Sequence, residues 1–329
     1  MDAQGRACRI AEIGGKKGMV KDIKFSAQAE TYLAALASRR RKPVKPTTIA
    51  TFRTAIGIAK PILGTLPVCD IESENLRQLV EHLVAERYAP NTIRLVVRTV
   101  KKAIASAVDG NGNPLIAKVW NADHVDEPEV IKQESELPTA AQIESVLHQA
   151  PPIVREFIAV QAATGLRRGE MLGLNAEDFN PVNLTLHVAR TRSYFGETSP
   201  KTRSGERIVD LHPSVAALLA RMLAGRTTGR LFDASIDTIR RAFERIGLKS
   251  HSLRHFRYTH LQVSAVPNAI RDYWIGHSAA GMEKIYGHMA QNTELRRNLA
   301  ADIGVGFKLP RTAAPKRAER QEIALQVTA

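Results

Sequence analysis

A polar stretch divides the sequence into two parts, and each part must form a hydrophobic core of its own. This stretch, EPEVIKQESELP at residues 127–138, contains four glutamates and two prolines and offers few apolar side chains for packing. We predict an extended linker here, between a domain at 25–126 and a second domain at 139–303. A basic extension at 1–24 and a tail at 304–329 flank the two domains.

The first domain has the pattern of a helical bundle. Its apolar residues recur at helical spacing, which predicts helices over residues 26–40, 47–63, 73–88 and 90–109. Ser73 is expected to be the N-cap of the third helix, and the breaker DGNGNP ends the fourth.

The second domain mixes helices with a short β region. Thr139 is the expected N-cap of a helix over 140–150, and further helices are predicted at 152–164 and 167–173. Two strands, LTLHVAR at 184–190 and RIVDL at 207–211, are expected to pair across a polar, Gly-containing loop. Helices return from Pro213 to about 302, so the fold class is mainly α with a small antiparallel β-sheet (α+β).

The charge balance favours a polyanionic partner. The 329 residues include 47 Lys and Arg against 33 Asp and Glu, a formal net charge of +14, which favours nucleic acid over an anionic membrane. In the helix at 90–109, four basic residues lie opposite the apolar face: Arg94, Arg98, Lys101 and Lys102. They are candidate DNA contacts, although a solvated helix surface explains the pattern equally well.

The sequence contains no feature of a membrane or secreted protein. No apolar run approaches the ~20 residues that span a bilayer, and the N-terminus lacks the apolar core of a secretory signal. Two cysteines, Cys8 and Cys69, are too few and too far apart for a metal site or a disulfide framework. We therefore expect a cytoplasmic protein that is associated with the nucleoid and uses no metal or cofactor.

Polar residues interrupt the apolar pattern of the second domain at two places. AATGLRRGEMLGL, at residues 162–174, places Arg167 and Arg168 side by side. Neighbouring helical positions point about 100° apart, so one arginine can face solvent while the other points into the protein or a ligand site. In HSLRHF, at 251–256, His251 and Arg254 share one face of a helix.

Two further residues complete an unusual set. Lys201 lies in the loop before the second strand, and Tyr286 follows His277 by nine positions. Each of these residues alone is more often structural than functional. Together, two arginines, a lysine, two histidines and a tyrosine suit phosphoryl transfer without a metal ion. Arginines can clamp phosphate oxygens with forked hydrogen bonds, and a phenol beside a base is a competent nucleophile.

Three segments resemble motifs of the tyrosine recombinase, or phage integrase, family. TGLRRGE resembles its first arginine motif, HSLRH its His-x-x-Arg motif, and IGHS with the later tyrosine its nucleophile segment. The resemblance covers residues 139–303 and, more loosely, the bundle before them. It implies a SAM-like core-binding bundle and a recombinase catalytic domain that together form a C-shaped clamp on DNA.

Matched residue by residue, the resemblance implies a role for each member of the set. Arg167 and Arg254 would clamp the scissile phosphate, and Lys201 would protonate the leaving 5′ oxygen. His251 would assist as a base toward the tyrosine, and His277 would donate a hydrogen bond to the phosphate.

The resemblance also implies the nucleophile and a supporting residue. Tyr286 would attack the phosphate, since its competitors Tyr258 and Tyr273 stand at the wrong distance from the Gly-His pair. Glu170 falls where the family has an acidic residue that supports the arginine and the histidine.

The implied function is site-specific DNA recombination through a 3′-phosphotyrosyl intermediate and a Holliday junction. Such an enzyme integrates or excises a phage or another mobile element. Its implied partners are double-stranded recombination sites, further copies of the chain in a homotetramer on synapsed DNA, and accessory DNA-bending or excision-directing proteins. A type IB topoisomerase-like enzyme and a catalytically silent DNA-binding regulator remain alternatives.

Overall fold

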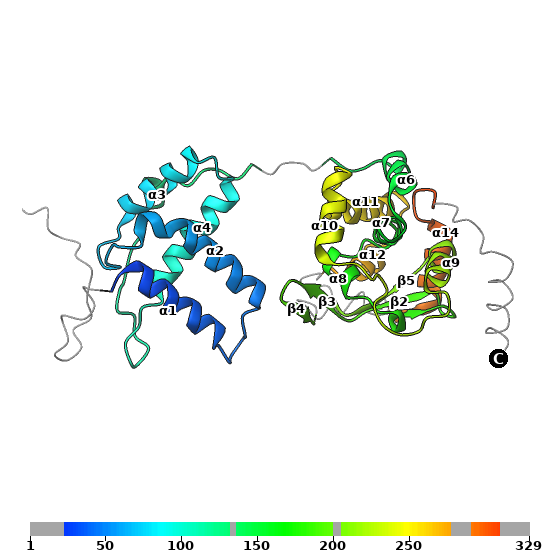
Figure 1. The fold of residues 1–329 in the computed structure, drawn as a ribbon, viewed down its shortest axis with the longest axis horizontal. Helices are drawn as coiled ribbons and strands as arrows, with labels where there is room; N and C mark the ends of the chain where they lie inside the picture. The colour runs from blue at the N-terminus through cyan, green and yellow to red at the C-terminus, as the bar shows by residue number, and fades with distance from the viewer. Residues whose placement is uncertain (1–22, 132–135, 200–204, 278–290, 310–329) are drawn as a thin grey trace, which may run out of the picture. The chain divides into compact units, whose positions relative to one another are not determined.

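The chain forms two compact units, residues 1–133 and residues 134–329, each with its own hydrophobic core (Figure 1). The computed structural model describes residues 23–131, 136–199, 205–277 and 291–309. The described parts of both units are mainly helical, as the sequence predicts, and the small antiparallel sheets lie in the second unit. In these parts no helix has both the length and the apolar character needed to cross a membrane.

The first unit is a helical bundle in which all four predicted helices are present. Its elements are α1 (Phe25–Ala37), α2 (Pro46–Leu63), α3 (Ser73–Ala85), α4 (Pro90–Ala105) and the short α5 (Ala122–Val125). Helix α2 packs against α1 and α4, and α3 packs against α4 and α5. The prediction that Ser73 caps α3 is wrong, because Glu72 occupies the N-cap position. The Ser73 hydroxyl instead accepts the backbone N–H of Asn121 at 3.1 Å.

The second unit is built around the packed pair α7 and α11. Thr139 caps its first helix as predicted, because its hydroxyl accepts the N–H of Gln142 at 3.2 Å. The helices among its described residues are α6 (Ala140–Gln149), α7 (Pro152–Thr164), α8 (Arg168–Gly173), α9 (Pro213–Leu223), α10 (Ile236–Arg245), α11 (Ser250–Val263), α12 (Asn268–Ile275) and α14 (Thr293–Ile303), with a 3-10 turn, η1 (Ala176–Asp178).

Two small antiparallel sheets complete the second unit. The first has the order β1 (Phe179–Asn180), β2 (Thr185–Val188), β5 (Arg207–Asp210), with Leu186 opposite both Phe179 and Val209. The second pairs β3 (Thr191–Ser193) with β4 (Gly196–Thr198) beside α8 (Figure 1). The sequence predicts a polar loop at this hairpin. The prediction fails because none of the hairpin's six residues is buried, so it lacks the apolar alternation of a strand.

The packed part of the second unit continues beyond α14. Val305 and Phe307 belong to its hydrophobic core, and the N–H of Lys308 donates to Glu144 at 2.8 Å. The described beginning of the tail is therefore part of the folded unit.

A buried carboxylate joins β5 to two helices of the second unit. Asp210 Oδ2 accepts from Trp274 Nε1 of α12 and from Arg296 Nε of α14, each at 2.7 Å. The Asp210 and Arg296 side chains are only 1% and 5% exposed. Because Asp210→Asn removes the carboxylate charge from beside a buried guanidinium, we expect the free energy of unfolding to fall by about 3–5 kcal/mol.

A urea titration of the full chain, followed by tryptophan fluorescence, measures this loss. The control is Asp237→Asn, because Asp237 forms an exposed ion pair with Arg240. We expect this control to change stability far less, since water screens exposed pairs. Equal losses in the two variants would contradict the assigned role of Asp210.

Candidate active site

The candidate site is built on a tight turn between α7 and α8. Gly165 ends α7 in the left-handed conformation, with φ +71°, and a Cβ there would lie 2.6 Å from the Ile275 side chain. The turn therefore requires glycine. Buried Gln161 links this region to α11, because its Nε2 donates to Ser250 Oγ at 2.8 Å. The end of α7 therefore lies beside α11, and Arg167 follows only two residues after Gly165.

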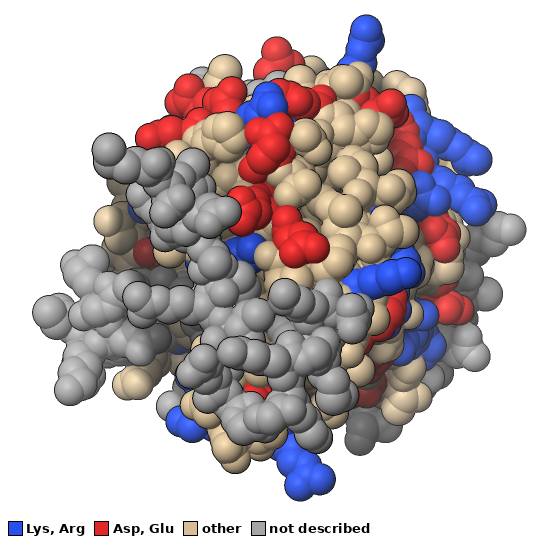
Figure 2. All heavy atoms as spheres, turned by 90° about the vertical axis from the view of Figure 1, so that its left-hand side faces the viewer, with Lys and Arg blue, Asp and Glu red and all other residues tan. Residues whose placement is uncertain are grey.

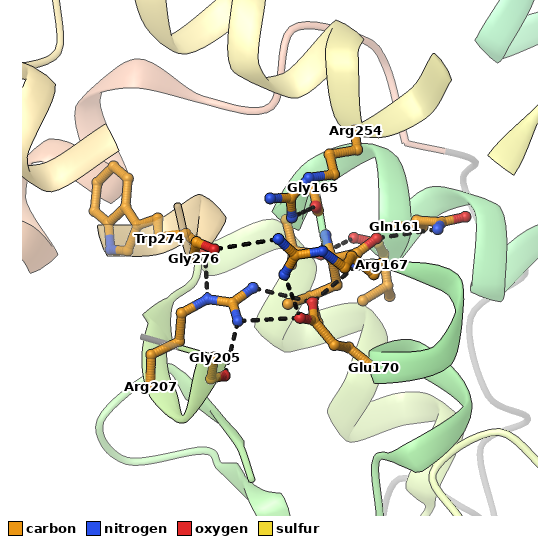
Figure 3. Close-up of polar contacts among 12 residues, drawn as sticks. Gln161, Gly165, Arg167, Glu170, Gly205, Arg207, Arg254, Trp274 and Gly276 are labelled. Carbon is orange, nitrogen blue, oxygen red and sulfur yellow. Dashed lines mark hydrogen bonds and ion pairs between the residues drawn. The ribbon is translucent and has the colours of Figure 1, made fainter. Parts of the chain in front are cut away.

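Arg167 lies at the start of a short helix, and the buried carboxylate of Glu170 holds it in place. It is the N-cap residue of α8, and its backbone N–H donates to Glu170 Oε2 at 2.9 Å. Its Nη1 donates to Glu170 Oε1 at 2.8 Å, and its Nη2 donates to the carbonyl of Gly276 at 3.2 Å (Figure 3). The Arg167 side chain remains 45% exposed, so further donors are available to a ligand. Arg168 begins α8 and is also exposed.

Helix α11 supplies a second arginine to the same place. Arg254 is 3% exposed, and its Nη1 donates to the carbonyl of Gly165 at 2.9 Å. Its Nη2 is buried and has no hydrogen-bond partner among the described residues. Burial, and then the charge of Arg167, lower the pKa of Arg254 to about 10, so it stays cationic at neutral pH. A buried cationic donor of this kind is well suited to bind an anion such as a phosphate.

Arg167, Arg254 and His251 line one cleft of about 580 Å³. The cleft continues over the residues between α10 and α11, and Glu244 is the only acidic residue among its described lining. Burial lowers the pKa of His251 below its usual value, and the charges of His255, Arg254, Arg167 and His277 lower it further. The imidazole is therefore neutral at pH 7 and can accept a proton.

His277 lies directly after Gly276, the residue whose carbonyl accepts from Arg167. Its ring centroid is 5.5 Å from that of Tyr258, and its Nδ1 is 3.6 Å from Asp272 Oδ1. Burial and the charge of Arg254 lower the pKa of His277, although Asp272 opposes this shift. His277 is thus a neutral imidazole close enough to the arginines to feel their charge.

Five candidate residues therefore gather in one region of the second unit: Arg167, Glu170, His251, Arg254 and His277. Lys201 and Tyr286 lie outside the described residues. Both competing tyrosines pack within the fold. The guanidinium carbon of Arg271 lies 4.7 Å from the ring centroid of Tyr258. The Tyr273 hydroxyl accepts a hydrogen bond from the backbone N–H of Ile208 at 3.3 Å.

The basic residues predicted on α4 only partly share one surface. Arg94, Arg98 and Lys101 line a groove of about 460 Å³. A carboxylate also lines it: Glu127 Oε1 lies 3.2 Å from Lys101 Nζ, and Glu127 Oε2 lies 3.8 Å from Arg94 Nε. The groove is therefore cationic but partly neutralised from within the same unit.

Lys102, the fourth of these basic residues, is not among the described residues that line the groove. Lys102 lies over the ring of Phe52 on α2, 5.6 Å from its centroid. The face drawn in Figure 2 shows acidic side chains gathered near its top and centre, with basic ones mainly along one edge. Among the described residues drawn on this face, basic side chains thus do not predominate.

Arg207, at the start of β5, is a member of the site that the sequence analysis missed. It is 4% exposed and donates to both carboxylate oxygens of Glu170, at 3.4 and 3.1 Å (Figure 3). The alternation of inward and outward residues along β5 could have identified it, because Ile208 is exposed whereas Val209 is buried. Arg207 falls on the same inward face as Val209.

No protein-family model matches this sequence, and no curated protein matches it either. Solved structures do match. The Tn1549 transposon integrase in complex with transposon right end DNA has a TM-score of 0.59 at 18% identity, over 92% of this chain and 99% of that chain. A lambda integrase tetramer bound to a Holliday junction has a TM-score of 0.57 at 18% identity, over 79% of each chain. The chain therefore shares the fold of these integrases over most of its length.

Proposed function

We propose that this chain is a tyrosine-type site-specific DNA recombinase, an integrase that cuts and rejoins DNA strands. One observation carries the proposal: Arg254, whose buried Nη2 has no hydrogen-bond partner among the described residues, lines the same cationic cleft as the exposed guanidinium of Arg167. The integrase fold supports it, as do the sequence motifs that end at Tyr286.

The arginines would stabilise the transition state of phosphoryl transfer. Attack on a phosphodiester places extra negative charge on its non-bridging oxygens. Arg167 and Arg254 would bind those oxygens through charge-assisted hydrogen bonds, and His277 would add a third donor. Because the arginines stabilise this charge, the reaction would require no metal ion. Because the energy of the broken phosphodiester is kept in the new one, it would require no ATP.

The proton transfers would use the remaining residues. Neutral His251 would accept the proton of the Tyr286 hydroxyl as its oxygen attacks phosphorus. The bond to the 5′ oxygen breaks, Lys201 protonates that oxygen, and a 3′-phosphotyrosyl intermediate remains. A 5′ hydroxyl of another strand then attacks this intermediate and releases the tyrosine.

We further propose the assembly in which this chemistry occurs. The core-binding domain at 25–126 and the catalytic domain at 139–303, joined by the linker at 127–138, would enclose double-stranded DNA as a C-shaped clamp. Four copies would act on two synapsed sites through a Holliday junction, with accessory DNA-bending or excision-directing proteins. The lambda integrase structure on a Holliday junction supports this assembly. Such an enzyme would act in the cytoplasm on a phage or other mobile element.

Covalent trapping tests the proposed chemistry. The protein is incubated with a nicked duplex, cut from the ends of the element that encodes it, in which the cleaved 5′ fragment diffuses away. A protein–DNA adduct that survives denaturing electrophoresis is the expected result. Tight binding without an adduct would favour the catalytically silent regulator. Relaxation of supercoiled plasmid under conditions that prevent synapsis would favour the topoisomerase-like enzyme.

The groove on α4 leads to a separate prediction about DNA affinity. If Arg94, Arg98 and Lys101 bind backbone phosphates, the Glu127 carboxylate competes with the DNA for two of them. Glu127→Gln should therefore tighten DNA binding by roughly 2–5-fold at low salt, and steepen its salt dependence. Fluorescence anisotropy of labelled duplex across a salt series measures both effects.

Glu129→Gln is the matched control for this prediction. Glu129 is exposed, lies two residues away and loses the same charge. If both substitutions tighten binding equally, the effect is one of net charge, and the groove has no special part in it. Unchanged binding by Glu127→Gln would show that DNA does not use this groove.

A further inference from the structure

The carboxylate of Glu170 is saturated by two arginines. Each of its oxygens accepts one hydrogen bond from Arg167 and one from Arg207. A carboxylate offers about four lone-pair positions, so the two arginines use all of them. Because Arg167 and Arg207 share these positions, the place of one guanidinium depends on the other.

Arg207 also hydrogen-bonds the backbone at the end of α12 and just before β5. Its Nε donates to the carbonyl of Trp274 at 2.8 Å, and its Nη1 donates to the carbonyl of Gly205 at 3.0 Å. Its guanidinium packs directly on Gly276, where a Cβ would lie 2.7 Å from Nη1. Gly276 in turn supplies the carbonyl that accepts from Arg167. Arg207 thus contacts both groups that orient the Arg167 side chain (Figure 3).

We propose that Arg207 is the positioning residue for Arg167, holding its guanidinium in the orientation that clamps the phosphate. This inference rests on the proposed recombinase function. Arg207 itself is buried and cannot touch DNA in this arrangement, since its side chain is 1% exposed. It acts by directing Glu170 and the end of α12 toward Arg167.

The electrostatics of Glu170 support this role. Burial alone would raise the pKa of its carboxyl, but the charge and hydrogen bonds of Arg207, followed by the backbone and side-chain hydrogen bonds of Arg167, lower it below its usual value. Without Arg207, burial is opposed by Arg167 alone, and the pKa of Glu170 rises. A protonated Glu170 binds Arg167 less tightly. Arg167 is therefore held in place when the pH is well above the pKa of Glu170, and it is released when the pH falls below that pKa.

The test compares single-turnover cleavage of the nicked duplex by the full chain and by Arg207→Met, which keeps the length of the side chain and removes its charge. We expect the cleavage rate to fall about 10–100-fold, the size typical of residues that orient a functional group. DNA affinity should stay within twofold. The loss should deepen as the pH is lowered toward the raised pKa of Glu170, more steeply than in the unaltered chain.

A double-substitution cycle distinguishes positioning from a general structural effect. If Arg207 acts through Glu170, then Arg207→Met in a Glu170→Gln background should cost little more than Glu170→Gln alone and should lose the added pH dependence. The control is Arg190→Met, which breaks the Arg190–Asp178 pair elsewhere in the unit. This control should lower thermal stability and leave the cleavage rate of folded protein unchanged.

Two outcomes would overturn the inference. One is a folded Arg207 variant that cleaves within twofold of the unaltered chain. The other is a loss that is fully additive with Glu170→Gln and does not change with pH. If Arg207→Met does not fold, Arg207→Lys replaces it, because lysine keeps the charge but cannot bind both oxygens as a fork. Failure of the proposed function is separate, since the unaltered chain would then form no adduct.

Discussion

Tyr286→Phe is expected to abolish the covalent protein–DNA adduct completely, while DNA binding remains within about twofold of the unaltered chain. Phenylalanine lacks the hydroxyl oxygen that would attack phosphorus, so no phosphotyrosyl bond can form. The removed atom is one oxygen, and the clamp that binds phosphate keeps all its donors. Denaturing electrophoresis of the nicked-duplex reaction measures the adduct, and a gel-shift titration measures binding.

Tyr258→Phe and Tyr273→Phe are the matched controls for this experiment. Tyr258 lies close to Arg271 and to His277, and Tyr273 accepts a hydrogen bond from the backbone of Ile208. Because neither is the expected nucleophile, both variants should still form the adduct. An adduct that persists in Tyr286→Phe and disappears in one of these would transfer the role to that tyrosine.

Arg254→Lys should lower the cleavage rate by about 10²–10³-fold, the usual effect of removing one preorganised donor to a developing charge. Lysine keeps the positive charge, but its single ammonium group cannot bind the Gly165 carbonyl and a phosphate oxygen in the same forked geometry. DNA affinity should fall by far less, since lysine keeps the positive charge that attracts the DNA phosphates. Rapid-quench cleavage of the nicked duplex measures the rate.

The matched control is Arg257→Lys, one turn later on the same helix. Arg257 is also buried, and its Nη1 donates to the carbonyl of Gly304 at 2.8 Å, where it supports the fold. This variant should lose thermal stability and keep its cleavage rate once folded. Similar rate losses in both variants would mean that α11 tolerates no lysine and that Arg254 has no special contact with phosphate.

Much of the local structure could be predicted from residue spacing alone. The four helices of the first unit and the strands β2 and β5 follow from apolar periodicity, because one face of each element must be buried. Capping was less certain. Thr139 caps α6 as predicted, whereas Ser73 does not cap α3, because Glu72 takes the N-cap position and Asn121 uses the Ser73 hydroxyl. Because Asn121 lies 48 residues after Ser73, the residues around Ser73 could not predict this contact.

The candidate site divides in the same way. The spacing of His251 and Arg254 on one helix, and the turn at Gly165, are local and could be read from the order of residues. The roles of Lys201 and Tyr286 remain predictions from the same motifs. The pairing of Glu170 with Arg207, and of Glu127 with Lys101, could not be read in this way.

Sequence alone therefore sufficed for the main helices, for strands β2 and β5 and for the division into two parts, because each depends on neighbours a few positions apart. Tertiary structure decided which of the candidate residues are free to bind a ligand. Arg167 and Arg207 have the same side chain, yet one is 45% exposed and the other 1%. The difference arises because α8, β5 and α12 meet around one buried carboxylate, and only their packing determines which guanidinium faces the cleft.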